Sequence, residues 1–450
     1  MPTLEDGREA GRDYGPEDGR QARERGGSRE LSAPRLRHGT PERAGLDRGE
    51  LRHLVREVHV LTTGQRPWAP GAVLVVGRGP VIAVEEAAGW AVRYSAYDED
   101  TDNGVELPAE DRVPMTVDTP FDLASLTKLF TAVAAVQQIE RGTLGIDARV
   151  GAYLPDFTAA ARHGITVRQL LTHTSGLRPD LPLYDCADDA GRLAALQAEA
   201  PVGAPGTYRY SDLNMLLLQH LLERLTGRTL DVLFRDGITR PLGMTATEFG
   251  PCPGAAATED QRQPWAKADR GMLRGEVHDE NAWALGGVAG HAGLFSTGRD
   301  LAVFCRALLA GGSYGPARIL GPDFVELLFT PPGLGFSIDQ RWFMGDLAGR
   351  GAAGHTGFTG TSLVLDPATD TFLILLTNAV HPPPPSPGQR TEGGGGVAGG
   401  AGVAGDVRAA AFCRRPRRGA ATAEPQGPTL NPARPVSAPA PGLVSRNSSR

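Results

Sequence analysis

The stretch FDLASLTKLFTAVAAVQQIERG, residues 121–142, most limits what this chain can fold into. Its large apolar residues recur mostly three or four positions apart from Leu126 onward, and Gly142 follows them, which predicts a helix with one buried stripe and a glycine stop. Ser125 is then expected in the first turn, with Lys128 one turn later on the same face. A hydroxyl beside an amine at a helix N-terminus can form an activated nucleophile, because the amine can accept the proton and the exposed N–H groups favour negative charge.

The lysine in this pattern is itself unusual for the chain. Only Lys128 and Lys267 are lysines among 46 basic residues, and the rest are arginines. Arginine is not deprotonated in proteins, whereas a buried lysine can shift its pKa and act as a base. The alternative is a surface lysine one turn from a capping serine, which the Ser-x-x-Lys pattern alone favours because short motifs often match by chance. Other parts of the chain have to decide between the two.

Composition narrows the class of protein. With 40% apolar and 22% charged residues among 450, the chain fits one large or two ordinary globular domains. A net charge of −6 gives no general reason to expect a nucleic-acid or membrane partner. The four scattered cysteines predict free thiols in a reducing compartment rather than a zinc site or a disulfide framework. Because the N-terminus lacks the apolar core of a signal peptide and no apolar run has membrane-spanning length, we expect a cytoplasmic protein, or a secreted one if the start site is misassigned.

Changes in composition divide the chain into three parts. Residues 1–38 are polar and residues 383–450 are a low-complexity Pro- and Gly-rich tail, so both are expected to be disordered, with one folded domain at 39–382. Within that domain the patterns predict helices at 46–61, 166–171, 188–198, 212–225 and 299–309, and strands at 72–76, 81–94, 362–365 and 372–376. Strands at both ends with helices between them predict one sheet built from both chain ends and a mostly helical lobe.

A cluster of polar residues precedes the helix expected at 212–225. It is the stretch YRYSDLN, from Tyr208 to Asn214, placed where a loop enters that helix. A tyrosine in such a loop usually packs, and Ser211 or Asp212 would serve as an N-cap. In a functional interpretation, Tyr210 relays protons to and from a serine if a nearby ammonium lowers its pKa.

A second cluster, GHTGFTG at 354–360, precedes the strand expected at 362–365. One explanation is a tight glycine-rich entry into the strand. The other is an edge strand that lines a cleft, with the N–H groups of Phe358 and Ser125 forming an oxyanion hole. Each cluster alone favours the purely structural explanation.

Taken together, Ser-x-x-Lys, Tyr-Ser-Asp and His-Thr-Gly occur in an order that resembles the serine β-lactamase and penicillin-binding protein superfamily, in its class C-related branch of esterases and D-aminopeptidases. Residues 166–177, 285–304 and 355–367 support this resemblance, which spans about 40–382. It implies an α/β, β-lactamase/transpeptidase-like fold, with an antiparallel sheet flanked by helices plus a mostly helical lobe. It implies a serine hydrolase that forms an acyl-enzyme and needs no metal or organic cofactor.

The resemblance also implies roles for individual residues. Ser125 would be the nucleophile, Lys128 its partner base, and Tyr210 the group that carries the proton to the leaving group. The substrate side would be formed by Asp212, His355, Thr356, Gly357 and Phe358.

Two departures from the family pattern bear on the substrate. Asp212 stands where asparagine is commoner, and an ionised carboxylate can accept but not donate a hydrogen bond. His355 replaces a lysine and is only partly charged near pH 7, so a substrate held by its free carboxylate, such as a penicillin, loses attraction there. We therefore expect hydrolysis of an ester, an amide or a D-amino-acid peptide ahead of β-lactam hydrolysis. The alternative is a non-catalytic relative that binds peptidoglycan-like peptides or β-lactams as a sensor.

Three further features lie outside these motifs: a possible nucleophile elbow, a possible metal site and the C-terminal end of the domain. Residues 311–315 match G-x-S-x-G but lack the strand before and the helix after that a nucleophile elbow needs, so a helix-ending loop is expected. His278, Asp279 and Glu280 with His291 lack a His-Glu-x-x-His spacing, which favours a polar loop over a metal site. The family's C-terminal helix is missing after residue 378, or displaced to about 406–414. The sequence does not predict an oligomeric state.

Overall fold

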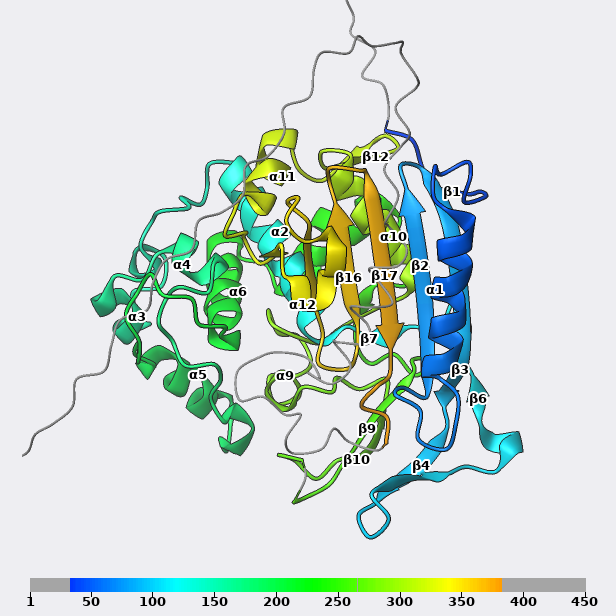
Figure 1. Ribbon diagram of the computed structural model, residues 1–450. Coiled ribbons are helices and arrows are strands. Elements are labelled where there is room, and N and C mark those ends of the chain that lie inside the picture. The colour runs from blue at the N-terminus through cyan, green and yellow to red at the C-terminus, as the bar shows by residue number, and fades with distance from the viewer. Residues whose placement is uncertain (1–32, 265, 383–450) are drawn as a thin grey trace, which may run out of the picture. The chain divides into compact units, whose positions relative to one another are not determined.

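Strands β2 (Gly71–Arg78) and β17 (Thr371–Thr377) come from opposite ends of the folded chain and pair directly, with Ala72 opposite Thr377 and Arg78 opposite Thr371. They form the centre of the main sheet in a computed structural model that describes residues 33–264 and 266–382 (Figure 1). The prediction that one sheet is built from both chain ends is therefore confirmed. The expected tail at 383–450 and the displaced helix at 406–414 lie outside the described residues.

The main sheet has the strand order β1-β3-β2-β17-β16-β15-β14, with β6 paired to β3. Apart from the parallel pair β1–β3, its strands are antiparallel. The remaining members are β1 (Arg37–His38), β3 (Val81–Val92), β6 (Val113–Pro114), β14 (Ser337–Ile338), β15 (Ala353–Thr356) and β16 (Ser362–Asp366). The sequence led us to expect that order begins at residue 39. Because β1 (Arg37–His38) already pairs with β3, ordered structure begins earlier.

Alternation along β2 and β17 divides the core into two layers. Val73, Val75 and Ile374 point into the large cluster that contains the helices α2 and α10. Leu74 and Leu375 point to the other face, where they pack against α1 (Arg48–Leu61). A period of two is what a strand buried on both faces requires.

Helix α2 (Thr127–Glu140) is enclosed by other helices instead of lying at the surface. It packs against α6 (Asp212–Thr226), α7 (Leu230–Phe234) and α11 (Pro322–Phe329), while α10 (Gly298–Leu309) separates it from the sheet (Figure 1). Phe130 of α2 stacks on Phe304 of α10 with ring centroids 4.4 Å apart. All residues from Thr127 to Gln138 are buried, so the expectation of a single buried stripe was wrong. Buried polar side chains of α2 form hydrogen bonds inside the protein. Thr131, for example, donates to the carbonyl of Gly290.

The middle of the chain is helical in its first part and mixed afterwards. Its further helices are α3 (Thr158–His163), α4 (Val167–Leu171), α5 (Asp189–Ala198), α8 (Arg240–Leu242), α9 (Glu280–Ala284) and, later in the chain, α12 (Arg341–Met344). Small sheets are formed by β7 (Phe121–Asp122), β11 (Leu294–Ser296) and β8 (Glu248–Phe249), by β9 (Ala257–Gln261) with β10 (Gly271–Arg274), by β4 (Tyr94–Asp98) with β5 (Asn103–Glu106), and by β12 (Ser313–Tyr314) with β13 (Ala317–Arg318). Within the described ranges, no helix is both long and apolar enough to cross a bilayer. Cys186, Cys252 and Cys305 are free thiols, as expected.

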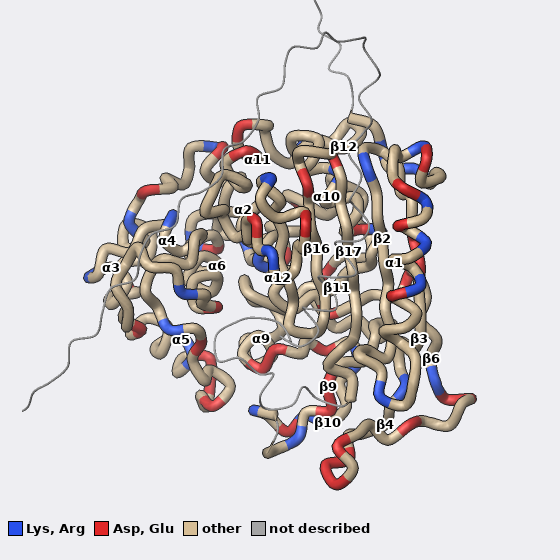
Figure 2. The backbone as a smooth tube through the Cα atoms, viewed as in Figure 1, with Lys and Arg blue, Asp and Glu red and all other residues tan. Residues whose placement is uncertain are grey.

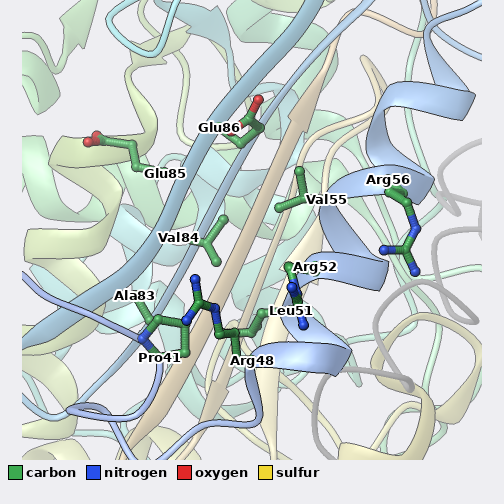
Figure 3. A pocket seen from close by; sticks show the side chains of 10 residues that line it. All are labelled: Pro41, Arg48, Leu51, Arg52, Val55, Arg56, Ala83, Val84, Glu85 and Glu86. Atoms are coloured by element: carbon green, nitrogen blue, oxygen red, sulfur yellow. The ribbon is translucent and has the colours of Figure 1, made fainter.

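A surface groove of about 500 Å³ lies between α1 and β3. Basic and acidic residues alternate along the exposed face of α1 (Figure 2). Arg48, Arg52 and Arg56 of α1 and Glu86 of β3 line the groove (Figure 3). Glu85 also borders it, but its side chain points away from α1 (Figure 3) and pairs with Arg299 of α10. None of its lining residues belongs to the cluster around Ser125.

Candidate active site

Ser125 lies in a short 3-10 turn, Ala124–Leu126, immediately before α2. The helix itself begins at Thr127, so Ser125 precedes the first turn in which the sequence placed it. Ala124 has a φ of +45°, a left-handed conformation that non-glycine residues seldom adopt. Its N–H donates to Asp122 Oδ1 at 2.8 Å, which holds this unusual turn and thereby the serine at the start of the helix.

Lys128 reaches Ser125 from the next turn and is completely buried. Its Nζ is 2.7 Å from Ser125 Oγ, 2.8 Å from Asp212 Oδ1 and 3.2 Å from the carbonyl oxygen of His291. Burial alone would lower the pKa of Lys128, but Asp212 and Tyr210 outweigh it and hold that pKa above its usual value. Lys128 is therefore an ammonium near neutral pH. This differs from the free amine that a resting base would need.

Tyr210 approaches the same serine from the other side. Its hydroxyl is 2.9 Å from Ser125 Oγ, and Lys128 Nζ lies 4.9 Å from the centre of its ring. Burial raises the pKa of Tyr210 to about 12, although the Lys128 ammonium opposes the rise. The sequence made proton relay by Tyr210 conditional on an ammonium that lowers its pKa. Lys128 acts in that direction, but desolvation of the phenolate is the larger effect and the pKa is raised.

Neither of the two candidate caps of α6 uses its side chain as a cap. Ser211 occupies the N-cap position, but its hydroxyl donates to the carbonyl of Arg178. Asp212 turns toward Lys128. The tertiary fold therefore diverts both side chains from the local role that the sequence favours.

His173, at the end of the stretch TVRQLLTHTSGL, supports Tyr210 from behind. Its Nδ1 accepts from the Ser211 N–H at 3.2 Å and from Asn214 Nδ2 at 3.0 Å, and its ring stacks on Tyr210. Burial and Lys128 lower the pKa of His173 to about 3, so the ring is neutral. Sequence reasoning treated His173 only as part of a helix end. Its place within residues 166–177, which support the family resemblance, was the one signal available.

The loop that follows β15 is attached to the residues just before Ser125. Thr359 Oγ1 donates to the Asp122 carbonyl at 2.8 Å, and Thr361 Oγ1 donates to the Leu123 carbonyl at 3.0 Å. Gly357 is required here, because a Cβ on it would stand 2.2 Å from Thr361 Oγ1 and 2.5 Å from the Leu123 carbonyl oxygen. The loop thus brings Gly357 against the nucleophile turn. That the Phe358 N–H joins that of Ser125 in an oxyanion hole stays a prediction.

His355 and Thr356 form the end of β15 next to this loop. The His355 ring lies 5.9 Å from the Tyr210 ring, and His355 Nδ1 is 2.6 Å from the Thr356 carbonyl oxygen. Burial and Lys128 lower the pKa of His355 to about 4, so it is neutral at pH 7 and not partly charged as expected.

A buried polar group that the sequence did not reveal lies beneath the turn. Asp122 Oδ2 accepts from the backbone N–H of His278 at 2.6 Å. The His278 ring is paired with Glu259 at 2.9 Å and lies 5.3 Å from the ring of Phe358. This network connects the nucleophile turn to the Phe358 loop from inside the core.

Asp279 and His291, which the sequence grouped as a polar loop, lie beside Lys128. His291 Nε2 is 2.8 Å from Asp279 Oδ1, and that oxygen also accepts from the Ala282 N–H. Single side-chain atoms of Asp212, Asp279 and His291 fall within 4.8 Å of one another. With Lys128 already paired to Asp212, we interpret this as a charge cluster centred on the ammonium.

The G-x-S-x-G match at 311–315 is separate from these residues. α10 precedes it, and Ser313 belongs to the two-residue strand β12, which pairs with β13. A strand–turn–helix elbow is not formed there, and a helix-ending loop is found as expected.

Sequence comparisons agree with this geometry. Residues 58–394 match the family model named Beta-lactamase. A putative D-alanyl-D-alanine carboxypeptidase of Escherichia coli K12 is 31% identical over 395 residues, covering 79% of this chain and 88% of that protein. An N-acetylmuramyl-L-alanine amidase of Bacillus subtilis is 32% identical over 357 residues, covering 70% and 78%.

Solved structures share the fold at lower identity. EstCE1, a hydrolase with promiscuous acyltransferase activity, superimposes with a TM-score of 0.59 at 22% identity and covers 80% of this chain and 99% of its own. The D-amino acid amidase of Ochrobactrum anthropi gives a TM-score of 0.54 at 21% identity, covering 73% and 91%. This chain therefore belongs to the Beta-lactamase family and is a serine hydrolase whose chemistry passes through an acyl-enzyme.

Proposed function

We propose that this chain hydrolyses an amide or ester whose leaving group carries no free carboxylate beside the scissile bond, with Ser125 as the nucleophile. The amide between a muramyl group and the L-alanine of a longer peptide is a bond of this kind, because the alanine carboxyl is itself in amide linkage. The Bacillus subtilis relative, named for cleavage of that bond, supports this choice.

The observation that carries the proposal is the row of contacts from Tyr210 through Ser125 and Lys128 to Asp212. It gives the serine hydroxyl a neighbour on each side for proton transfer. In the proposed reaction Ser125 Oγ attacks the carbonyl carbon, and its proton passes through this row to the leaving amine or alcohol. Water then repeats the sequence on the acyl-enzyme. The backbone N–H groups of Ser125 and Phe358 would hold the oxyanion.

The restriction on the leaving group rests on His355. At the position where the family pattern has a lysine, a buried and neutral imidazole supplies a hydrogen-bonding group without a positive charge. A terminal D-alanine or a penicillin carries its carboxylate next to the amide nitrogen and so depends on such a charge. Substrates without that carboxylate lose no binding energy when position 355 has no positive charge.

Two measurements test the proposal. A fluorophosphonate probe should label the wild type but not Ser125→Ala, while Ser313→Ala, which removes the serine of the G-x-S-x-G match, should keep full labelling. A folded wild type that resists the probe would favour the non-catalytic binding protein.

Substrate preference is measured on matched peptides. We expect release of L-alanyl peptide from a muramyl dipeptide. We also expect a peptide ending in D-alanyl-D-alanine amide to be cleaved at least as fast as the same peptide with a free carboxylate. A clear preference for the free acid, or rapid penicillin hydrolysis with negligible cleavage of nitrophenyl esters, would contradict the proposed substrate class.

A further inference from the structure

Three oxygen atoms surround the Nζ of Lys128: Ser125 Oγ and the His291 carbonyl oxygen accept hydrogen bonds from it, and Asp212 Oδ1 forms an ion pair with it. Ser125 Oγ, Asp212 Oδ1 and the His291 carbonyl oxygen lie at 2.7, 2.8 and 3.2 Å. An ammonium has three N–H donors and no lone pair, so this arrangement fits the protonated form of Lys128.

Asp212 is the carboxylate in direct contact with that ammonium. The side chain of Lys128 is fully buried, whereas that of Asp212 is 23% exposed. A buried ammonium without a counter-charge is strongly unfavourable. Asparagine, the commoner residue at this point of the family motif, has the same size but could not neutralise the charge.

Asp279 is a second carboxylate near Lys128, and the charges of His291 and Lys128 hold its pKa below the usual value despite its burial. Asp279 is held by His291 and by the Ala282 N–H. The remaining groups that interact electrostatically with Lys128 are Tyr208, Tyr210, His173 and His355. Tyr210 is a neutral phenol and the two histidines are neutral imidazoles, as described above.

We propose that Asp212 is a positioning residue that holds Lys128 in its protonated form and so sets the pH range in which Ser125 is acylated. This rests on the proposed function only in taking Ser125 as the nucleophile. It replaces the substrate-binding role that the family pattern implies for position 212.

Proton accounting shows why Asp212 controls the pH range. When the bond between Ser125 Oγ and the carbonyl carbon forms, the serine proton must go to Lys128 or Tyr210. One of these two therefore has to lose a proton to solvent beforehand. The same proton later moves to the leaving nitrogen or oxygen as its bond to carbon breaks. The Asp212 carboxylate opposes the first loss because it stabilises the positive charge of the pair.

The test is the pH profile of acylation in Asp212→Asn. Asparagine keeps the size and the oxygen of the side chain beside Lys128, but the negative charge is gone. We expect the apparent pKa of kcat/KM for an uncharged nitrophenyl ester to fall by about 1–3 units, the range found when one opposite charge is removed at contact distance. KM for this ester should change little. Asp156→Asn, which removes an acid from the exposed pair with Arg224, is the matched control and should leave the profile unchanged.

Each outcome decides between roles. Superimposable profiles of Asp212→Asn and wild type, with Ser125 still labelled by a fluorophosphonate, would refute the inference and leave the proposed function intact. A raised KM with an unmoved profile would return Asp212 to substrate binding. A wild type that is not labelled at all would overturn the proposed function itself. Circular dichroism and a urea titration of the variant separate misfolding from a change in acylation.

Discussion

The phenol ring of Tyr210 stacks on the imidazole of His173, with ring centroids 4.8 Å apart and an angle of 29° between the planes. Nδ1 of His173 is held by Ser211 and Asn214, so the imidazole is a fixed platform for the phenol. With the ring held in this position, the Tyr210 hydroxyl donates a hydrogen bond to Ser125 Oγ at 2.9 Å. Removing the hydroxyl alone should therefore abolish proton transfer by Tyr210 and leave the position of its ring unchanged.

Tyr210→Phe should lower kcat by roughly 10²–10⁴-fold, the usual contribution of one positioned proton-transfer group. The ring remains to stack on His173, so the free energy of unfolding should stay close to that of wild type. Ester turnover under saturating substrate and a urea titration measure the two quantities. Tyr208→Phe is the control, since that tyrosine is 63% exposed, and it should be fully active. Equal activity of the two variants would remove Tyr210 from the proton path.

Gly357→Ala should separate the Phe358 loop from the nucleophile turn. The new methyl group would stand 2.2 Å from Thr361 Oγ1 and 2.5 Å from the Leu123 carbonyl oxygen, closer than packed atoms can approach. Because the carbonyl is backbone, the loop has to move. We expect a loss of stability of about 1–3 kcal/mol, typical of overpacking, together with a lower acylation rate. Gly254→Ala, where no heavy atom lies within 4 Å of the new methyl group, should change neither quantity. If Gly357→Ala behaved in the same way, the close approach would be wrong.

His381 should make the protein sensitive to acid. Its Nε2 accepts from the N–H groups of Arg93 and Tyr94, and its Nδ1 is 3.0 Å from the Thr258 carbonyl oxygen. Burial lowers the pKa of His381 from 6.5 to about 4. Between pH 6.5 and 4, His381 is therefore protonated in the unfolded chain but neutral in the folded chain. Stability is fully present above pH 6.5 and is lost as the pH falls toward 4.

The loss from this one group is roughly 3 kcal/mol, at about 1.4 kcal/mol per pKa unit. His173 and His355 add losses of the same sign. Urea titrations between pH 7 and 4 should show a shallower fall for His381→Gln than for wild type. His163→Gln, at an exposed position on α3, should follow the wild-type slope. A His381→Gln slope equal to that of wild type would mean that the imidazole is not held neutral.

Local patterns predicted much of the fold because they report on short-range physics. Short apolar runs bounded by turn residues identified β2, β16 and β17, and the helical period with its stop residues identified α1, α5, α6 and α10. The same rules located α2 but misjudged its burial, because they predicted a single buried stripe. A helix packed on several sides has no polar face to mark its period, and its buried polar groups are satisfied by partners far away in sequence, as Gln137 is by the Gly237 and Ile319 carbonyls.

The sequence by itself determined the residues that meet: a serine and a lysine one helical turn apart, and two motifs whose family order placed Tyr210 and His355 beside them. Only the tertiary structure decided their charge states. Asp212 was a candidate cap until the fold brought it to 2.8 Å from Lys128. The sequence alone offered no reason to expect unusual pKa values for Tyr210 and His355. Burial in the folded protein raises the pKa of Tyr210 and lowers that of His355. Spacing along a chain fixes which side chains can be neighbours. Desolvation and long-range pairing, which set the proton affinities of those side chains, exist only once the chain has folded.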